Sequence, residues 1–209
     1  MELTWYGLSC FRLTERGKAN VVTDPYNTKL GLPALKLKSD IVTISHDAPG
    51  HNYLKAVSGY SHALTGPGEY EIGGVFVTGV ATRHRDESVR NVLFVIDFNN
   101  LTVVHLGDIG QLPSQSQIED FGEVNVLLVP VGGGSSLNAA QAAELVSMLE
   151  PNLVVPMHYA IPGQNLELDS AERFLKEMGV TDVAEESVLR VTSTSLPEET
   201  EVVLLQPKI

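Results

Sequence analysis

Cysteine and tryptophan are almost absent from this chain of 209 residues, which contains one of each. The single cysteine, Cys10, cannot form an internal disulfide, and such cysteine usage is typical of a reducing compartment. We therefore expect a cytoplasmic protein. A lone thiolate also excludes a cysteine-rich zinc cluster, so a metal site in this chain has to use imidazole and carboxylate ligands.

Positive charge is scarce too. Lysine and arginine number 14 against 26 acidic residues, which gives a formal net charge of −12. Nucleic-acid binding relies on a positive surface that displaces counterions, so we expect no nucleic-acid partner. Long hydrophobic runs are also missing, since none approaches the roughly 18–20 residues that span a bilayer. We expect no membrane partner.

What the chain does have is the composition of a globular protein, with 43% hydrophobic and 19% charged residues. Its length suits one compact domain with a sizeable core. No repeat, low-complexity segment or linker divides it, so residues 1–209 are predicted to form a single domain.

Strand-like segments dominate the first half of the chain. Apolar, β-branched runs that end at turn residues predict strands, and they cover residues 3–7, 10–14, 19–26, 41–44, 63–82 and 91–108. The last of these is the clearest hairpin, because Asn99 and Asn100 tolerate the backbone of a tight turn. In the second half, residues 124–130 and 152–159 read as buried strands, and two short strands end the chain.

Helices are predicted mainly in the second half. Alanine, valine and leucine recur at helical spacing over residues 139–149, with Ser136 or Asn138 as the N-cap. A second helix is predicted over residues 170–178. In the first half, residues 52–58 suit one or two helical turns with Asn52 as the N-cap. Strands followed by strand–helix–strand units favour an α/β fold in which helices flank packed sheets.

Histidines mark the ends of several predicted strands. Of six histidines, four lie in or just beyond an apolar run: His46, His84, His105 and His158. If these strands run side by side in the same direction, their ends meet at one edge and could hold a metal. Each histidine taken alone is more simply a hydrogen-bonded residue at a strand end. The recurrence favours a metal cluster, whereas His62, in a polar loop, is expected to be structural.

Several motifs carry a resemblance to a known family. They are GLSCF, TDPY, the loop around His46, GPGEYEIGGVFVTGV before His84, HLGDIG, LLVPVGGG and VVPMHY. With these motifs the chain resembles the metallo-β-lactamase superfamily, and within it the metal-dependent hydrolases similar to L-ascorbate-6-phosphate lactonases. The resemblance implies a four-layer αββα sandwich, the metallo-β-lactamase fold, with metals at the edge between two sheets.

The resemblance also implies a set of metal ligands. Carried over by position, His46 and His84 belong to one site and His51 and His158 to the other, with Asp108 as the bridge. We expect Asp108 and His158 to act in catalysis as well. His105 is expected to support Asp108 from the strand that precedes it.

The sequence departs from the family's loop motif, H-x-H-x-D-H. Ala48 and Gly50 occupy two ligand positions, and neither can bind a metal; Leu8 and Gln111 replace histidines that are frequent in relatives. Both half-sites then depend on Asp108, which favours one zinc ion, or two weakly held ones, with manganese or iron as alternatives. Three carboxylates stay open as substitutes for the missing aspartate: Asp24, Asp47 and Asp86.

These observations predict a hydrolase of a small ester, lactone or phosphorylated metabolite that uses a metal-activated water. The alternative is an inactive member of the fold with a binding or assembly role. A nuclease is disfavoured by the net charge. The triple glycine at residues 132–134 is expected to be a tight turn rather than a phosphate cradle. A homo-oligomer stays open, because the sequence does not indicate the oligomeric state.

Overall fold

The computed structural model describes residues 1–86 and 88–209. Within these ranges most strands belong to two large mixed sheets. The first sheet has the order β15 (Leu189–Arg190), β1 (Glu2–Trp5), β2 (Phe11–Thr14), β3 (Val21–Thr23), β5 (Ile41–Thr43) and β7 (His62–Leu64). The second has the order β16 (Glu201–Val202), β13 (Leu153–Met157), β12 (Val126–Pro130), β11 (Thr102–His105), β10 (Arg90–Asp97), β9 (Val75–Arg83) and β8 (Gly68–Ile72). The pairs β4 (Leu37–Lys38) with β6 (Val57–Ser58) and β14 (Glu185–Glu186) with β17 (Leu204–Leu205) form two small sheets.

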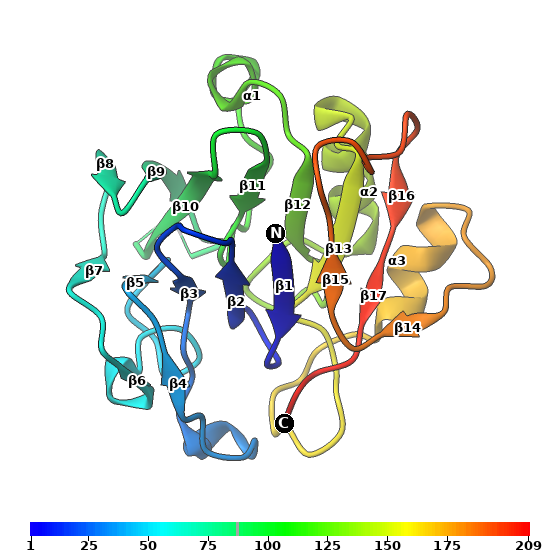
Figure 1. Ribbon diagram of the computed structural model, residues 1–209. Helices are drawn as coiled ribbons and strands as arrows, with labels where there is room; N and C mark the ends of the chain where they lie inside the picture. The colour runs from blue at the N-terminus through cyan, green and yellow to red at the C-terminus, as the bar shows by residue number, and fades with distance from the viewer. Residues whose placement is uncertain (87) are drawn as a thin grey trace.

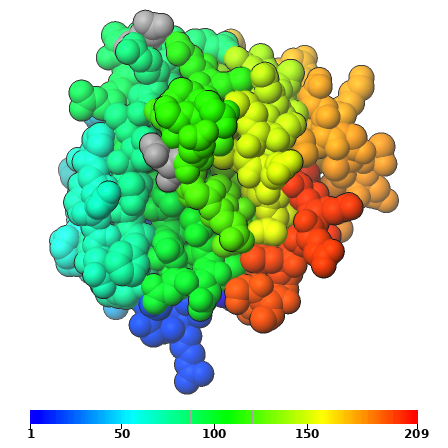
Figure 2. Space-filling model, turned by 90° about the horizontal axis from the view of Figure 1, so that it is seen from above, coloured from blue at the N-terminus to red at the C-terminus, as the bar shows by residue number. Residues whose placement is uncertain are grey.

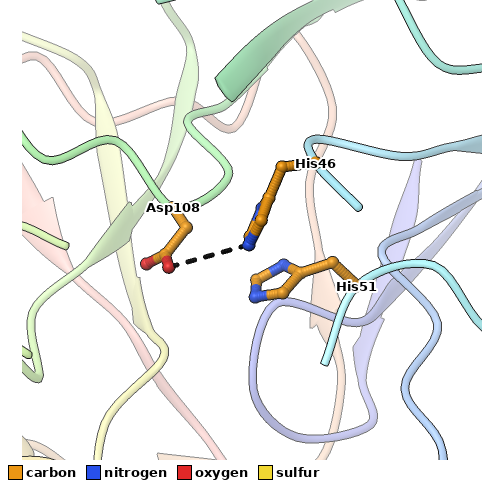
Figure 3. Close-up of side chains that lie close together, drawn as sticks. All are labelled: His46, His51 and Asp108. Atoms are coloured by element: carbon orange, nitrogen blue, oxygen red, sulfur yellow. Dashed lines mark ion pairs between the residues drawn. The ribbon is translucent and has the colours of Figure 1, made fainter. Parts of the chain in front are cut away.

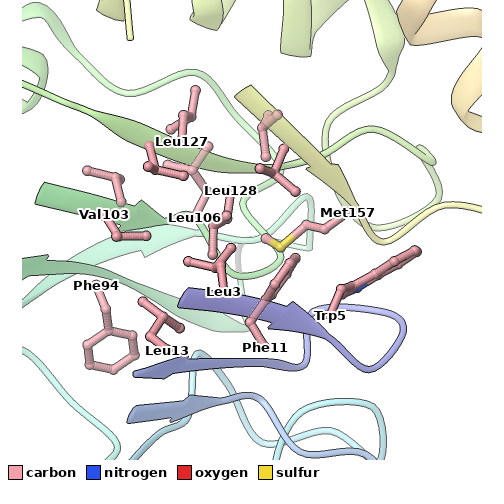
Figure 4. Packing of buried hydrophobic residues seen from close by; sticks show 14 of the residues in the cluster. Leu3, Trp5, Phe11, Leu13, Phe94, Val103, Leu106, Leu127, Leu128 and Met157 are labelled. Carbon is pink, nitrogen blue, oxygen red and sulfur yellow. The ribbon is translucent and has the colours of Figure 1, made fainter. Parts of the chain in front are cut away.

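The two large sheets pack face to face and enclose the core (Figure 1). Side chains of β1 and β2, among them Leu3, Phe11 and Leu13, face side chains of the second sheet such as Phe94 and Leu128 (Figure 4). All five residues of β12, and all five of β13, are buried. Continuous burial of this kind is expected of parallel strands that are covered on both faces. The predicted α/β class and metallo-β-lactamase fold are confirmed.

The second half of the chain adds helices to this sandwich, as predicted. Helix α2 (Ala139–Leu149) begins at Asn138, whose side chain accepts a hydrogen bond from the Gln141 amide, so Asn138 and not Ser136 is the N-cap. Helix α3 (Ala171–Glu177) packs against α2, and Figure 2 shows the two side by side on one flank (α2 yellow, α3 orange). Helix α1 (Gln115–Phe121), capped by Ser114, was not predicted.

One local prediction needs correction. The turn after His51 is a single 310 turn, η2 (Leu54–Ala56), preceded by Tyr53, so the prediction of Asn52 as its N-cap is wrong. The Asn52 side chain instead donates a hydrogen bond to Asp47. Another 310 turn, η1 (Thr28–Leu30), lies between β3 and β4.

The segment predicted as strand over residues 63–82 divides between the two sheets. Strands β8 and β9 form an antiparallel hairpin in the second sheet, whereas β7 joins the first sheet, parallel to β5. The chain therefore crosses from one sheet to the other between β7 and β8. No helix in the described part of the chain is long and apolar enough to cross a membrane.

The topology brings strand ends from both sheets to one place. Strands β11, β12 and β13 are parallel, and β9 runs in the same direction as β11 because each is antiparallel to β10. The loops after β9, β11 and β13 carry His84, Asp108 and His158. His46 follows β5 in the first sheet, so the strand ends meet at the edge between the two sheets, where the resemblance places the metals.

Candidate metal centre

Five of the predicted residues line one cavity of about 310 Å³: His46, His51, His84, Asp108 and His158. Asp108 lies at their centre. Its Oδ2 is 3.2 Å from His84 Nε2 and 4.0 Å from His46 Nε2, and its Oδ1 is 3.7 Å from His158 Nδ1. One ligand atom each from His46, His51 and Asp108 lie within 4.8 Å of one another (Figure 3).

These distances suit ligands of one metal. Two ligands that are each about 2.0–2.2 Å from a zinc ion lie at most about 4.4 Å apart. The three distances from Asp108 are below this limit. Asp108 Oδ1 and His158 Nδ1 are both buried, and neither makes a hydrogen bond within the described residues. Two unsatisfied polar atoms that face each other in a buried site are what a bound cation would satisfy.

The loop that carries Asp108 is held in place by Asn91 and Ser135. Buried Asn91, on β10, accepts a hydrogen bond from the Asp108 amide and donates one to the Leu106 carbonyl. The loop also approaches the first sheet closely: at Gly107, with φ +62°, a Cβ atom would lie 2.4 Å from Ser45 Cβ. Only glycine fits there, and this close approach brings Asp108 near His46, which follows β5 of the first sheet.

Ser135 contacts Asp108 directly. Its hydroxyl donates a hydrogen bond of 2.6 Å to Asp108 Oδ2. Ser135 lies in the loop that follows the triple glycine. That loop was predicted as a turn without a role in the site. It makes the turn between β12 and α2, and it also supplies a cavity-lining side chain.

Asp24 lies behind His51 and is fully buried. The Nδ1–H of His51 donates to Asp24 Oδ2 at 2.8 Å, because a carboxylate only accepts, and the Ser45 amide donates to Oδ1 at 2.7 Å. Histidine ligands of metals usually have such a carboxylate on the second ring nitrogen, which leaves Nε2 for the metal. Asp24 therefore orients His51 and is not a substitute for the aspartate missing at position 50.

The other two candidates for that aspartate lie outside the cavity. Asp47 accepts the hydrogen bond from Asn52, and exposed Asp86 accepts hydrogen bonds from Ser88. The Asp86 amide does have a role, since it donates to His84 Nδ1 at 3.1 Å; the neutral ring then carries its proton on Nε2, which faces Asp108 Oδ2 at 3.2 Å. Of the acidic side chains on the described residues, only Asp108 and the exposed Glu167 line the cavity.

The charges of the site differ from those of the free side chains. Burial raises the pKa of Asp108, but His158 and the hydrogen bond from His84 outweigh this effect and hold the pKa well below its usual range. Burial and the neighbouring His51 lower the pKa of His46 to about 4. Burial lowers the pKa of His51, but the hydrogen bond and the charge of Asp24 raise it by more, so the net shift is upward. At neutral pH the site therefore offers an ionised carboxylate and a neutral His46, the forms that bind metals.

His105 and His62 lie outside the cavity. The ring of His105 is fully buried between the sheets, where its Nε2 donates to the Ser9 carbonyl at 2.9 Å and its edge meets Phe11. His105 thus ties β11 to the turn between β1 and β2. His62 lies on the exposed side of β7 and contacts Ser61, as expected for a structural residue.

Comparisons with known proteins agree with this geometry. The family described as Beta-lactamase superfamily domain matches residues 2–158. A "UPF0173 protein" of Pyrococcus furiosus is 30% identical over 205 residues, covering 85% of this chain and 90% of the relative. A "UPF0173 metal-dependent hydrolase" of Methanoculleus marisnigri is 29% identical, covering 80% and 86%.

A solved structure is also similar along almost the whole chain. It is a candidate Zn-dependent hydrolase of the metallo-β-lactamase superfamily from Thermotoga maritima, with a TM-score of 0.81 and 33% sequence identity. The match covers 98% of this chain and 97% of that one. Both sheets and the loops that carry the five cavity-lining residues thus belong to a fold that relatives share.

Proposed function

The chain belongs to the UPF0173 family of the metallo-β-lactamase superfamily, and we propose that it is a hydrolase that uses one divalent metal ion to cleave a small ester or lactone. The observation that carries this proposal is the meeting of four histidines around Asp108, whose Oδ1 has no hydrogen-bond partner among the described residues. Relatives named as metal-dependent hydrolases support the reaction class.

His46, His51 and Asp108 would hold the ion, with His84 and His158 on either side of the carboxylate. Imidazole and carboxylate ligands suit zinc, and they also suit manganese or iron. A metal held there would polarise the substrate carbonyl and lower the pKa of a water molecule toward about 7.

The chain's own residues position the reactants. Water adds to the carbonyl carbon, the bond to the leaving oxygen breaks, and the proton of the water ends on that oxygen. His158 is buried, and burial lowers its pKa, so it is neutral at pH 7, the form in which its Nδ1 can donate a lone pair to the ion beside Asp108 Oδ1.

One metal fits the cavity better than two. Ala48 and Gly50 supply no ligand atoms, and a Cβ at position 50 would lie 3.3 Å from Leu30 Cδ1. A side chain at position 50 would therefore need Leu30 to shift by a few tenths of an ångström. We expect one bound metal per chain, and a second only after both ligand positions are restored by Ala48→His and Gly50→Asp.

The test combines elemental analysis with an assay. Purified protein is loaded with zinc, manganese or iron, its metal content is measured, and hydrolysis of γ-butyrolactone and p-nitrophenyl acetate is followed. Asp108→Asn should lose both metal and activity, whereas Asp97→Asn, which changes a carboxylate of the β10–β11 hairpin outside the cavity, should keep both. A protein that binds no metal at micromolar concentration, with or without the restored ligands, refutes the proposal.

The second candidate function is an inactive member of the fold with a binding or assembly role. The loss of two ligand positions, at Ala48 and Gly50, favours it. The two candidates differ in one measurement, because an inactive protein that retains a metal would show stoichiometric metal content and no rate above that of Asp108→Asn.

A further inference from the structure

The cavity of about 310 Å³ is lined by two unlike sets of side chains. One set is the histidines and Asp108, and the other, the apolar side, is largely Leu30, Leu166 and Leu168 together with Ala48. Among the described lining residues there is neither a lysine nor an arginine. The apolar side therefore offers contacts for hydrocarbon and no counter-charge for a phosphate or a carboxylate.

Two segments distant in sequence form the apolar side, and hydrogen bonds hold them together. The Asn165 amide donates to the Leu30 carbonyl, and the Asn165 side chain donates to the Lys29 carbonyl, both at 3.0 Å. The backbones approach so closely that a Cβ on Gly31 would lie 2.3 Å from the Gly163 carbonyl oxygen. The segment that carries Leu30 is thus fixed to the segment that carries Leu166 and Leu168.

This apolar wall lies next to position 50, where the family's motif has an aspartate. Leu30 and Leu8 are the side chains nearest to the position that a Cβ on Gly50 would take, at 3.3 and 3.9 Å. Gly50 is buried, and Ala48 lines the same cavity. Leucine side chains therefore occupy the space beside position 50, and Ala48 adds a methyl group to the same lining.

We propose that this wall is a substrate subsite for a neutral hydrocarbon group, an alkyl chain or ring, that lies next to the bond to be cleaved. This inference rests on the proposed hydrolase function and adds the substrate class. Transfer of a hydrocarbon group from water to such a wall is favourable, whereas a phosphate would face Asp108 and Glu167 without a lysine or an arginine to pair with. The cavity is small by the standard of ligand sites, which run from about 300 Å³ upward, so the substrate is small as well.

A second cavity provides an internal control. It measures about 660 Å³, shares no lining residue with the first, and is lined by Arg83, Arg90 and Leu112 among others. A phosphorylated substrate would find cationic side chains there. Leu112 is a partly buried leucine like Leu166, so the two can be compared directly.

The experiment uses the full chain loaded with zinc and labelled with 13C on the leucine methyl groups. The probes are 2-methyl-, 2-propyl- and 2-pentylcyclopentanone, carbocyclic analogues of alkyl lactones that cannot be hydrolysed. We expect the methyl signals of Leu30, Leu166 and Leu168 to shift while those of Leu112 stay unchanged. Each buried methylene should tighten binding about threefold to fourfold, the equivalent of about 0.8 kcal/mol, until the cavity is full.

Variants then test whether the apolar wall causes the dependence of probe affinity on alkyl length. Leu166→Ser should remove most of the dependence on alkyl length without changing the metal content, and Leu112→Ser should leave that dependence as it is. A thermal unfolding curve confirms that both variants fold. Binding that is independent of alkyl length, or shifts at Leu112 instead, overturns the inference. So does inorganic phosphate that binds more tightly than the pentyl probe.

Failure of the subsite and failure of the hydrolase function give different results. If the probes bind at the three leucines but no ester or lactone is hydrolysed, the subsite stands and the reaction class is wrong. If γ-butyrolactone is hydrolysed but the leucine signals do not respond to the alkyl probes, the hydrolase stands and the substrate class is wrong.

Discussion

Asp24→Asn tests how the metal site is organised, because it replaces one oxygen of a fully buried carboxylate with an NH2 group. In the structure Asp24 accepts three hydrogen bonds, from the Ser45 amide, the Ser45 hydroxyl and His51 Nδ1–H. Asparagine keeps an oxygen for the amide but presents an N–H donor to the other two. His51 Nδ1 then has to accept, so its proton moves to Nε2, the nitrogen that faces the metal.

The expected loss of metal affinity is about 10–100-fold, the usual effect of removing such a partner of a ligand. This corresponds to about 1.4–2.7 kcal/mol. The metal-free protein should lose about 1.5–3 kcal/mol of unfolding free energy, since a buried hydrogen bond to a charged group disappears. Competition with a chelating dye measures the affinity, and urea unfolding measures the stability.

Asp40→Asn is the matched control for this change. The Asp40 carboxylate also accepts a backbone hydrogen bond, from the Asn20 amide at 2.8 Å, but it is exposed and does not line the metal cavity. It should leave metal affinity unchanged. If Asp24→Asn binds metal as tightly as the wild type while remaining folded, the argument from the His51 tautomer is wrong.

Three further predictions follow from the same contacts. Gly31→Ala should lower the unfolding free energy by about 1–3 kcal/mol more than Gly17→Ala in urea unfolding, because both have positive φ but only Gly31 is in close contact with another backbone. Ser135→Ala should weaken metal binding about 5–10-fold in the dye assay, since it removes the hydrogen bond to Asp108; equal affinity would contradict the role given to Ser135. In the metal-free protein, the stability difference between wild type and Asp24→Asn should depend on pH. The pKa of Asp24 is lowered, so its contribution is present above the ordinary carboxylate pKa of about 3.9 and is lost as pH falls through the lower folded value. The pKa of His51 is raised, so its contribution is present below about 6.5 and is lost as pH rises through the higher folded value. Urea unfolding should therefore find the largest difference between about pH 4 and 6.5, and a difference that is constant from pH 4 to 9 would contradict the ion pair.

The sequence predicted those parts of the fold whose cause is local. The β10–β11 hairpin follows from two apolar runs around Asn99, which adopts φ +75°, and helix α2 follows from its apolar spacing and its cap. Helix α1 was missed because it is short and its capping box, Ser114 with Gln117, precedes no clear apolar period. The position of β7 in the first sheet depends on contacts with β5 that no local pattern encodes.

The site shows the same division. Histidines after apolar runs could be found by inspection, and the resemblance arranged them around Asp108. The residues that fix Asp108 and His51 in place are harder to find. Asn91, Ser135 and Asp24 make hydrogen bonds to partners 17 to 27 positions away in the chain. Asparagine, serine and Asp-Pro are common in turns and strand ends, so their sequence context indicates only a turn. The TDPY motif was the one signal that pointed to Asp24.

The structure also suggests why this end of the molecule depends on a ligand. His158 and Leu8 adopt positive φ values of 51° and 50°, which are unfavourable for residues other than glycine and asparagine. The His158 amide donates a hydrogen bond to the Leu8 carbonyl. Next to this strained pair, Asp108 Oδ1 and His158 Nδ1 are buried without hydrogen-bond partners among the described residues. Strain and unsatisfied polar atoms each cost about 1–3 kcal/mol. A cation bound between these atoms would offset this cost, so metal binding and the stability of this end of the fold should be coupled.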